Sequence, residues 1–536
     1  MTNLVSRAKQ AINQRWVHAA SNRRWQYLSR EVAQYALEKS DQAPVIFFNA
    51  STRLQAMSQN AAYSYLTAQA LRMQGVPIIQ FACKAGLSRC VLGSNRDDVS
   101  KAPPCDRCIA QSAAVYENIP TRWFEYRSDV ALEKEIETLS VPELIAFTHE
   151  DAPLGFWAVN SLRWVLRRHH LNDDPNTQQF MRHFILSGWN VVKQFGALVT
   201  EVHPQAIVVF NGMFFPEAAA RFVGQKHKIR VITHEVGMRP FTAFFTEGEA
   251  TAYPIHISDH FQLTDPMNEK LDHYLSQRFQ GNFTMAGIRF WPEMKGLPAD
   301  FLEKAARFKQ IVPVFTNVIF DTSQVHANTI FEEMFIWLDN VLEVIKTHPD
   351  TLFVLRAHPD EHREGKEARE SVRGWANERN LTQYDNVVFV DSREFLSSYD
   401  LIQRSHFVMV YNSTIGLEAS LMGKVVLAAG KARFTQLKTA YLPESKAAYF
   451  KMLDELLKAE TIQVPDEFKA NARRFLYYQL YCSSLPFDAF LREDGVWKGY
   501  VTLKEFKLSD LTPEHSATIQ AILEGILMKK PFELSL

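Results

Sequence analysis

The sequence has little cysteine, little excess charge and no long apolar run. Five cysteines among 536 residues are too few for a disulfide framework, and their odd number fits a reducing, cytoplasmic environment. Lysine and arginine number 59 against 60 aspartate and glutamate residues, which argues against a general nucleic-acid-binding protein. No run of about 18 apolar residues occurs, so a membrane-spanning helix is not expected. The N-terminal region shows neither an apolar signal core nor a small-residue cleavage site.

Apolar side chains are plentiful, and one segment departs from the even charge balance. Hydrophobic residues make up 46% of the chain and include 38 phenylalanines, which suits a globular protein of several domains. Residues 1–40 are predicted to form a basic helix that carries Trp16 and Trp25. Its basic side chains precede the first acidic residue and are Arg7, Lys9, Arg15, Arg23, Arg24 and Arg30. Such a helix could contact an anionic membrane, placing the protein peripherally at the inner membrane, or could dock its aromatics on the core.

Short apolar runs alternate with helical patterns, which predicts parallel α/β sheets with right-handed crossovers. One series lies within residues 41–295 and a second within residues 310–460, while residues 461–536 are predicted to be a helical tail. The fold class is therefore predicted to be α/β, with two Rossmann-like, doubly wound domains and extra helices at both ends. Ligands of such sheets bind at the carboxyl ends of the strands, so we expect a site in a cleft between the domains.

In the second domain, the segment from 412 to 418 follows an apolar strand and opens a helix. Asn412, Ser413 and Thr414 are N-cap residue types, and the N–H groups at such a junction can bind a phosphate. Gly416 would allow a ligand or a second backbone to approach closely. Glu418 could accept hydrogen bonds from two ribose hydroxyls. The alternative is an ordinary capped helix in which Glu418 completes a capping box.

A second polar group follows the strand 351–356. Arg356 offers a guanidinium fork for a phosphate, and His358 stands where that strand meets the expected cleft. Pro359 would stiffen the turn that presents the imidazole. His358 could stabilise a departing nucleotide phosphate or act as an acid, whereas the alternative is a loop histidine without a chemical role.

The first domain also places polar residues at the ends of its strands. One strand ends at Asn211 and Gly212, and the next ends at His234 and Glu235, shortly before Gly237. Glu235 or His234 could be the general base for an incoming hydroxyl group. Each of these side chains could equally serve to hydrogen-bond the loop that follows.

Four of the five cysteines lie within one short segment. Cys83 and Cys90 are separated by six residues, and Cys105 and Cys108 form a C-x-x-C pair. A C-x-x-C pair is a good two-ligand metal knuckle, but the wider pair is not a standard one. Structural zinc, reduced thiols, and a redox or iron–sulfur role all remain open from the sequence.

The C-terminal half resembles the capsule polysaccharide synthesis family of bacterial glycosyltransferases, the group that contains the Kdo transferases of capsule assembly. The resemblance spans about 206–460. The segments that carry it are FNG (Phe210–Gly212), HEVG (His234–Gly237), FTNVIFDTS (Phe315–Ser323), FIWLDNVL (Phe335–Leu342), RAHPDE (Arg356–Glu361), YNSTIGLEASLMGKVVLAAG (Tyr411–Gly430) and KARF (Lys431–Phe434).

This resemblance implies a GT-B fold with the acceptor in the first domain and a nucleotide-activated sugar in the second. It also implies that the donor site contains Arg356, His358, Ser413, Thr414 and Glu418. GT-B enzymes need no catalytic metal, and the chain contains no D-x-D motif.

The expected activity is sugar transfer from a nucleotide-sugar donor to a saccharide or lipid-linked saccharide acceptor in the synthesis of a bacterial surface polysaccharide. No nucleic-acid partner is expected. Two alternatives remain, a nucleotide-sugar epimerase of the same fold and a non-catalytic nucleotide-sugar-binding scaffold subunit.

Overall fold

The computed structural model describes residues 2–36, 42–49, 56–279, 296–363, 365, 367–495 and 499–535, with the backbone alone for residues 2–15. The predicted domain boundaries at residues 40–41 and 295 fall on parts of the chain outside these ranges. Among the described residues, none of the helices combines the length and hydropathy that crossing a bilayer requires.

The first half of the protein is built on a mainly parallel sheet. Its strands are β1 (Val45–Asn49), β2 (Ile78–Cys83), β3 (Thr121–Phe124), β4 (Ala206–Phe210), β5 (Arg230–Val236), β6 (Thr242–Glu247) and β12 (Leu485–Pro486). Their order across the sheet is β12-β6-β5-β4-β1-β2-β3. The strands from β3 to β5 pair in parallel, whereas β6 pairs antiparallel with both β5 and β12. The order β3-β2-β1-β4-β5 is that of a doubly wound sheet, as predicted.

The second half contains a smaller, fully parallel sheet. Its strands are β7 (Gln310–Phe315), β8 (Thr351–Arg356), β9 (Val387–Val390), β10 (Val408–Val410) and β11 (Val426–Ala428). They lie in the order β11-β10-β7-β8-β9. The chain direction across the sheet therefore reverses between β7 and β10. In a doubly wound sheet this switch point opens a crevice at the carboxyl ends of the two strands. The predicted second α/β unit is confirmed.

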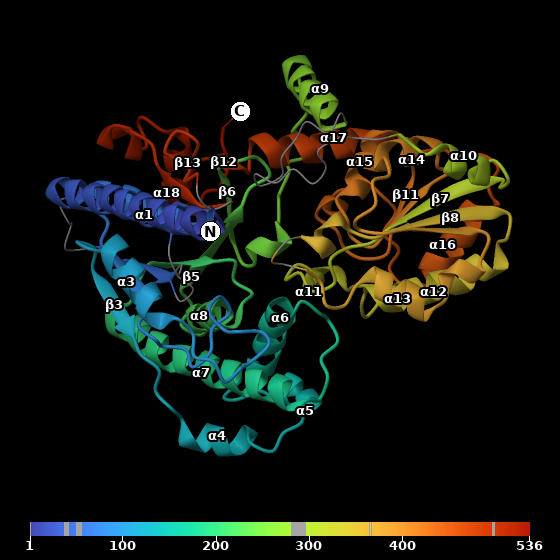
Figure 1. Cartoon of the computed structure of the whole chain (residues 1–536). Helices are drawn as coiled ribbons and strands as arrows, with labels where there is room; N and C mark the ends of the chain where they lie inside the picture. The colour runs from blue at the N-terminus through green and yellow to red at the C-terminus, as the bar shows by residue number, and fades with distance from the viewer. Residues whose placement is uncertain are drawn as a thin grey trace.

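Helices cover both faces of each sheet (Figure 1). In the first half they are α1 (Thr2–Tyr35), α2 (Gln59–Met73), α3 (Cys105–Val115), α4 (Val130–Ile136), α5 (Val141–Ala146), α6 (Leu154–Leu166), α7 (Pro175–Val202), α8 (Phe215–Lys226) and α18 (Ala517–Met528). In the second half and its connections they are α9 (Asp265–Phe279), α10 (Ala299–Ala305), α11 (Gln324–Ala327), α12 (Met334–Thr347), α13 (Val372–Glu378), α14 (Ser398–Arg404), α15 (Ile415–Leu421), α16 (Lys446–Lys458) and α17 (Asp466–Tyr481).

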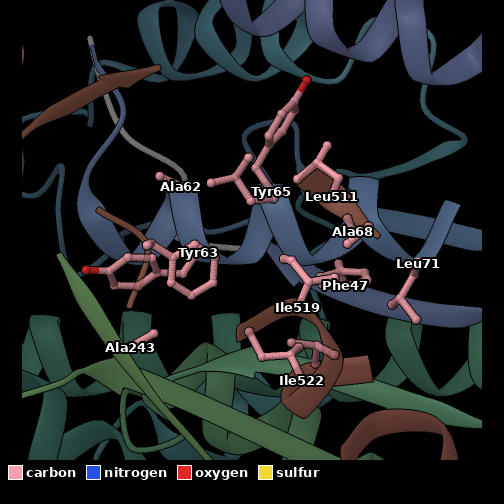
Figure 2. Packing of buried hydrophobic residues seen from close by; sticks show 14 of the residues in the cluster. Phe47, Ala62, Tyr63, Tyr65, Ala68, Leu71, Ala243, Leu511, Ile519 and Ile522 are labelled. Carbon is pink, nitrogen blue, oxygen red and sulfur yellow. The ribbon is translucent and has the colours of Figure 1, made fainter. Parts of the chain in front are cut away.

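Alternating side chains divide each half into two cores. In β1, Val45 and Phe47 face a cluster shared with α2 and α18, while Ile46 and Phe48 face a cluster shared with α7. Figure 2 shows the first of these clusters, where Tyr63 and Tyr65 of α2 pack near residues of α18. All four strand residues are 2% exposed or less. Such burial on both faces explains why the parallel strands appear in the sequence as continuous apolar runs.

The C-terminal segment 461–536, expected to be a helical tail, also contains strands. Helix α17 packs against α15 of the second half, and the chain then returns to the first half, where β12 pairs with β6. A short hairpin of β13 (Leu491–Glu493) and β14 (Val501–Leu503) follows, and α18 packs on α2. Figure 1 shows these red elements beside the blue helix α1. The strands were not foreseen because each has only two or three residues, too few for a readable alternation.

Candidate functional site

A pocket of about 360 Å³ lies at the carboxyl ends of the strands of the second sheet. Its walls follow β7, β8, β10 and β11, and residues 251–254 of the first half close one side. The lining residues are Thr251, Ala252, Pro254, Asn317, Val318, Asp321, Ser323, Gln324, His326, Thr329, His358, Asp360, Asn412, Ser413, Thr414, Lys431, Ala432, Arg433 and Gln436. The pocket therefore lies at the switch point of a doubly wound sheet, which is the place where ligands of such sheets bind.

The predicted strand-end residues Asn412, Ser413 and Thr414 line this pocket. The backbone N–H of Asn412 donates to Oδ1 of Asn317 at 3.2 Å, which ties the end of β10 to the end of β7. Thr414 is the N-cap of α15, but its side chain makes no capping hydrogen bond. The N–H groups of Gly416 and Leu417 donate to the carbonyl oxygens of Ser413 and Thr414 at 3.0 and 3.1 Å. The polar groups that this segment offers to the pocket are therefore those of the lining residues Asn412, Ser413 and Thr414, whose side chains are suited to hydrogen-bonding a phosphate.

His358 lines the same pocket, in the loop that follows β8. Its Nδ1 accepts a hydrogen bond from the backbone N–H of Asp360 at 3.1 Å. Burial lowers the pKa of His358 from its ordinary value, although Asp360 and Asp321 oppose the shift. A neutral ring whose Nδ1 accepts must carry its proton on Nε2. His358 is thereby prepared to donate a hydrogen bond to an anionic group from Nε2.

Arg356 lies behind the pocket instead of lining it. It is the last residue of β8, pairs in register with Phe315 of β7 and is 4% exposed. Its carbonyl oxygen accepts from the N–H of Thr316 at 3.2 Å and from the Thr316 hydroxyl at 3.0 Å. Burial lowers the pKa of its guanidinium to about 10. The structure therefore does not place this side chain on the pocket wall, where the sequence predicted a phosphate ligand.

Glu418 and Gly416, predicted to contact a nucleotide, are also away from the pocket wall. Glu418 is 5% exposed, and its Oε1 accepts from Nε of Arg278 on α9 at 2.9 Å. Its Oε2 accepts from the Tyr399 hydroxyl at 2.6 Å. A Cβ atom on Gly416 would lie 2.7 Å from Cζ of Phe434, so this glycine admits a neighbouring ring. Glu418 therefore points towards α9, where its carboxylate forms an ion pair with Arg278.

In the first half, Glu235 is held by neighbouring amides. Asn60 Nδ2 donates to Oε1 of Glu235 at 2.8 Å, and Asn211 Nδ2 donates to Oε2 at 2.9 Å. The N–H of Val236 donates to Oε1 at 2.9 Å. Neither Glu235 nor Asn211 lines the pocket described above. The sequence thus grouped Asn211 with Glu235 correctly, but their closeness to a substrate stays a prediction.

His234 lies inside the apolar core. It is 1% exposed, and its ring lies 6.0 Å from that of Phe210 and 5.3 Å from that of Phe245, centroid to centroid. Burial lowers its pKa to about 3. It does not line the pocket, and it points to the face of β5 opposite to that of Glu235. The predicted role of His234 as a base therefore has no support in this geometry.

The two predicted acceptor-side glycines have backbone roles. Asn211 and Gly212 have φ of 59° and 84°, a left-handed turn that asparagine and glycine tolerate better than other residues. A Cβ atom on Gly237 would lie 2.3 Å from Oγ1 of Thr242. Both glycines permit close packing, and neither lines the pocket.

Sequence reasoning missed a contact between the two halves at the pocket. Nε2 of His326 lies 3.0 Å from Oγ1 of Thr251 and 3.3 Å from Oε2 of Glu249. Oε1 of Glu249 accepts from Arg221 at 2.9 Å. Burial lowers the pKa of His326, although Glu249 opposes the shift. Only the fold reveals this pair, since His326 lies on a single-turn helix, where periodicity gives no signal.

Two cations of the pocket were also not predicted. Lys431 and Arg433 follow β11 and line the pocket opposite residues of the first half. The guanidinium carbon of Arg433 lies 3.5 Å from the ring centroid of Tyr253, a cation–π contact between the halves. The KARF string that contains both residues was noted, but its charges were not assigned a role.

The cysteine segment does not show the geometry of a metal site. Cys83 Sγ accepts from the N–H of Gly86 and Cys90 Sγ accepts from the N–H of Gly93, both at 3.2 Å. Burial raises the pKa of these thiols to about 12 and about 11 respectively, so without a bound metal they are protonated thiols at neutral pH. Within the described ranges, which include Cys105 and Cys108, no three His, Cys, Asp or Glu residues are grouped to hold a metal ion. Structural zinc, reduced thiols and a redox or iron–sulfur role therefore stay alternative predictions for these cysteines.

All the pocket-lining residues of the second half lie within one segment that matches a known protein family. Residues 292–437 match the family described as "Capsule polysaccharide biosynthesis protein". The predicted resemblance to the capsule polysaccharide synthesis family is thus confirmed over this segment. A comparison with curated proteins gives no match.

Solved structures similar to this chain include two KpsC transferases and an epimerase. The Thermosulfurimonas dismutans KpsC β-Kdo 2,4 transferase is 11% identical, with a TM-score of 0.33 over 52% of this chain and 80% of its own. The β-Kdo 2,7 transferase of the same protein is 14% identical, with a TM-score of 0.32 over 63% and 90%. The UDP-GlcNAc 2-epimerase from Neisseria meningitidis is 12% identical, with a TM-score of 0.23 over 82% and 99%. Likenesses this remote do not decide the function.

Proposed function

We propose that this protein is a GT-B glycosyltransferase that moves a sugar from a nucleotide-activated donor to a saccharide acceptor in the synthesis of a bacterial capsule-like polysaccharide. One observation carries the proposal. The segment 292–437, which matches the capsule family, supplies the hydroxyl, imidazole and cationic groups that converge on one pocket between two doubly wound halves. That combination suits a phosphate-linked donor at the second sheet and an acceptor entering from the first half.

The proposed donor site binds the nucleotide phosphates at Ser413, Thr414, Lys431 and Arg433. The two hydroxyl groups and the two cations would stabilise the charge that develops on the departing phosphate. His358 would donate to the same phosphate from Nε2. These groups supply positive charge without a metal ion, so we propose that transfer is metal-independent.

The acceptor hydroxyl needs a base on the side of the first half. Glu235 already accepts three hydrogen bonds from protein groups, which leaves it poorly placed to take a proton. His326 is the better candidate, because it lines the donor pocket and its contacts with Thr251 and Glu249 join it to the first half. In this proposal Nδ1 of His326 takes the proton, and Glu249 stabilises the resulting imidazolium from Nε2.

A thermal-shift panel tests the donor site first. Wild-type protein and Lys431→Ala are heated with CMP, CDP, UDP, GDP or ADP. A ligand at about 100 times its dissociation constant adds about 2.7 kcal/mol to the free energy of unfolding, so the wild-type midpoint should rise by several degrees with one nucleotide. Lys431→Ala should lose most of that rise. If no nucleotide stabilises the folded wild type, the donor site is wrong and a scaffold role becomes the better explanation.

A product assay then separates transfer from epimerisation. The nucleotide sugar that carries the stabilising nucleotide is incubated with the protein, first alone and then with saccharide acceptors. A transferase releases nucleotide in step with the glycosylated acceptor. An epimerase changes the sugar without any acceptor, and that result would overturn the proposed transfer.

A further inference from the structure

One wall of the donor pocket is lined by two carboxylates and a buried amide. Asp321 and Gln324 lie in the segment that follows β7, and Asp360 lies in the loop that follows β8. The N–H of Gln324 donates to the carbonyl oxygen of Asp321 at 3.0 Å, so these two residues belong to one turn. Carboxylates repel phosphates, so this wall suits a part of the ligand other than its phosphates.

Acceptor atoms on this wall lack donors within the described part of the chain. Gln324 is 5% exposed, and its Oε1 is a buried acceptor that no donor of the described residues reaches. Oδ1 of Asp360 is likewise buried without a hydrogen-bond partner there. Oδ1 of Asp321 accepts from the N–H of Ser323 at 2.8 Å. Native proteins satisfy nearly all buried polar groups, so the two unsatisfied acceptors point to donors that a ligand supplies.

The donors that match this wall are neutral hydroxyl groups. Arg363 lies 3.8 Å from Asp360 and does not line the pocket, so part of the negative charge is balanced from outside the pocket. A ligand at this wall meets the carboxylate and amide oxygens and not that guanidinium. A hydroxyl group donates a hydrogen bond without bringing a charge, whereas a carboxylate brings acceptors alone. A sugar ring with hydroxyl groups on this side therefore fits, and a ring with a carboxylate on this side does not.

The wall lies where the two halves of the protein meet. Asp321 and Gln324 also line a small cavity whose other side includes residues of α6 of the first half. His326, the proposed base, is on the same single-turn helix as Gln324, and its Nε2 lies 3.0 Å from Oγ1 of Thr251. In the proposed reaction the sugar that moves lies between the leaving phosphate and the acceptor, and therefore between the halves. This places the wall beside the transferred sugar.

We propose that Asp321, Gln324 and Asp360 bind hydroxyl groups of the transferred sugar, which makes the donor a nucleotide-activated neutral sugar and not one that carries a carboxylate. Hydroxyl groups that donate to ionised carboxylates make strong hydrogen bonds. An acidic sugar would place acceptors against acceptors, and a negative charge beside two others, so the same residues that favour one class of sugar disfavour the other. This inference rests on the proposed transferase activity and names the class of sugar that it moves.

The test compares sugar 1-phosphates, which carry a sugar ring and its phosphate without a nucleoside. Glucose and galactose 1-phosphates are paired with glucuronate and galacturonate 1-phosphates, which have a carboxylate in place of the C6 hydroxymethyl group, and inorganic phosphate gives the baseline. Dissociation constants come from ligand-observed NMR titrations. We expect at least one neutral sugar phosphate to bind at least about tenfold more tightly than inorganic phosphate and than its acidic counterpart. The absence of that advantage, or tighter binding of an acidic sugar phosphate, would overturn the proposal.

Conservative variants assign the preference to this wall. Asp321→Asn and Asp360→Asn keep the size of the side chain and remove its charge, so each should reduce the advantage of the neutral over the acidic sugar phosphate by at least about threefold. Gln324→Met keeps the length of the side chain, removes the acceptor and should weaken binding of the neutral sugar phosphate. Asp350→Asn, at an exposed position just before β8, is the matched control and should keep the wild-type ratio. A ratio that stays unchanged in both variants of the wall counts against the proposal, and the wild-type comparison decides if a variant does not fold.

The nucleotide panel keeps this inference apart from the proposed function. If one nucleotide stabilises the wild type, Asp321→Asn and Asp360→Asn alike, the donor site stands, and the sugar phosphates decide the class of sugar. If that nucleotide stabilises the wild type but neither variant, the wall binds the nucleoside, and its assignment to the transferred sugar is wrong. If no nucleotide binds, the proposed donor site fails whatever the sugar phosphates do.

Discussion

Arg278 and Glu418 form an ion pair between α9 and α15 in which both side chains are almost fully buried, at 8% and 7% exposure. The Tyr399 hydroxyl donates a hydrogen bond to Oε2 of the same glutamate. Removing one partner of a buried pair leaves the other charge desolvated. Glu418→Ala should therefore lower the free energy of unfolding by about 3–5 kcal/mol, measured by urea denaturation.

The control for this prediction replaces both charges. Glu418→Leu combined with Arg278→Met should recover most of the lost stability, because a buried ion pair is often no more stabilising than apolar residues of similar volume. If Glu418→Ala unfolds like the wild type but no longer binds nucleotide, the sequence-based role of Glu418 in ribose binding is right and the structural role is wrong.

His358 should matter for turnover if it acts on the leaving phosphate. His358→Ala removes the Nε2–H donor, and we expect turnover to fall roughly 10²-fold, an effect typical of acid–base groups. Steady-state transfer assays at saturating donor check this. His348→Ala, at the end of α12 and outside the pocket, is the matched control and should keep full activity. Full activity of His358→Ala would remove the proposed role.

His234 should make stability depend on pH. Its pKa falls from 6.5 to about 3 on folding, so the unfolded chain takes up the proton first as the pH drops. The contribution of His234 is complete above about pH 6.5 and declines by about 1.4 kcal/mol per pH unit towards pH 3. Urea midpoints at pH 7 and pH 5 should therefore differ less for His234→Phe than for the wild type. Equal differences in the two proteins would mean that His234 is not the buried neutral group described.

Helix α1 carries the proposed contact with a membrane. Trp16 and Tyr27 are 70% and 60% exposed, and they share one face of the helix with Arg23 and Arg30. Trp25, on the opposite face, is fully buried. The helix therefore packs on the protein core through Trp25 and leaves Trp16 and Tyr27 exposed to solvent. We expect co-sedimentation with vesicles that contain phosphatidylglycerol, no co-sedimentation with phosphatidylcholine alone, and release at high salt.

The variants for the membrane test remove charge from the exposed face. Arg23→Gln combined with Arg30→Gln should weaken vesicle binding by about 2 kcal/mol, at about 1 kcal/mol per basic residue. Arg404→Gln, on α14 of the second half, should bind vesicles like the wild type. Equal binding to neutral and anionic vesicles would contradict an electrostatic contact.

The sequence predicted the strands and their carboxyl ends well because both follow from local patterns. The apolar run before Asn412 had to be a buried strand, and polar N-cap residues had to follow it. Gly75 follows α2 with a φ of 75°, a backbone conformation that glycine adopts readily after a helix. Parallel pairing then brings the ends of β7, β8 and β10 to one edge without further information.

The positions that sequence reasoning missed or misplaced depend on rotation and tertiary contact. Glu418 is only three residues into α15, but one turn of helix decides whether a side chain faces the pocket or α9. His326, Lys431 and Arg433 sit on single turns and loops, where no periodicity predicts direction.

The return of the chain through α17 to β12 restricts how the two halves can move. The polypeptide crosses between them once on the way to β7 and again before β12. At the second crossing Ser484 accepts from the N–H of Met238 at 3.0 Å, and Arg239 donates to the carbonyl of Leu480 at 2.8 Å. The two halves are therefore joined by two covalent connections. Two connections restrict the relative motion of the halves more than one connection would, and they favour the orientation in which Thr251 meets His326.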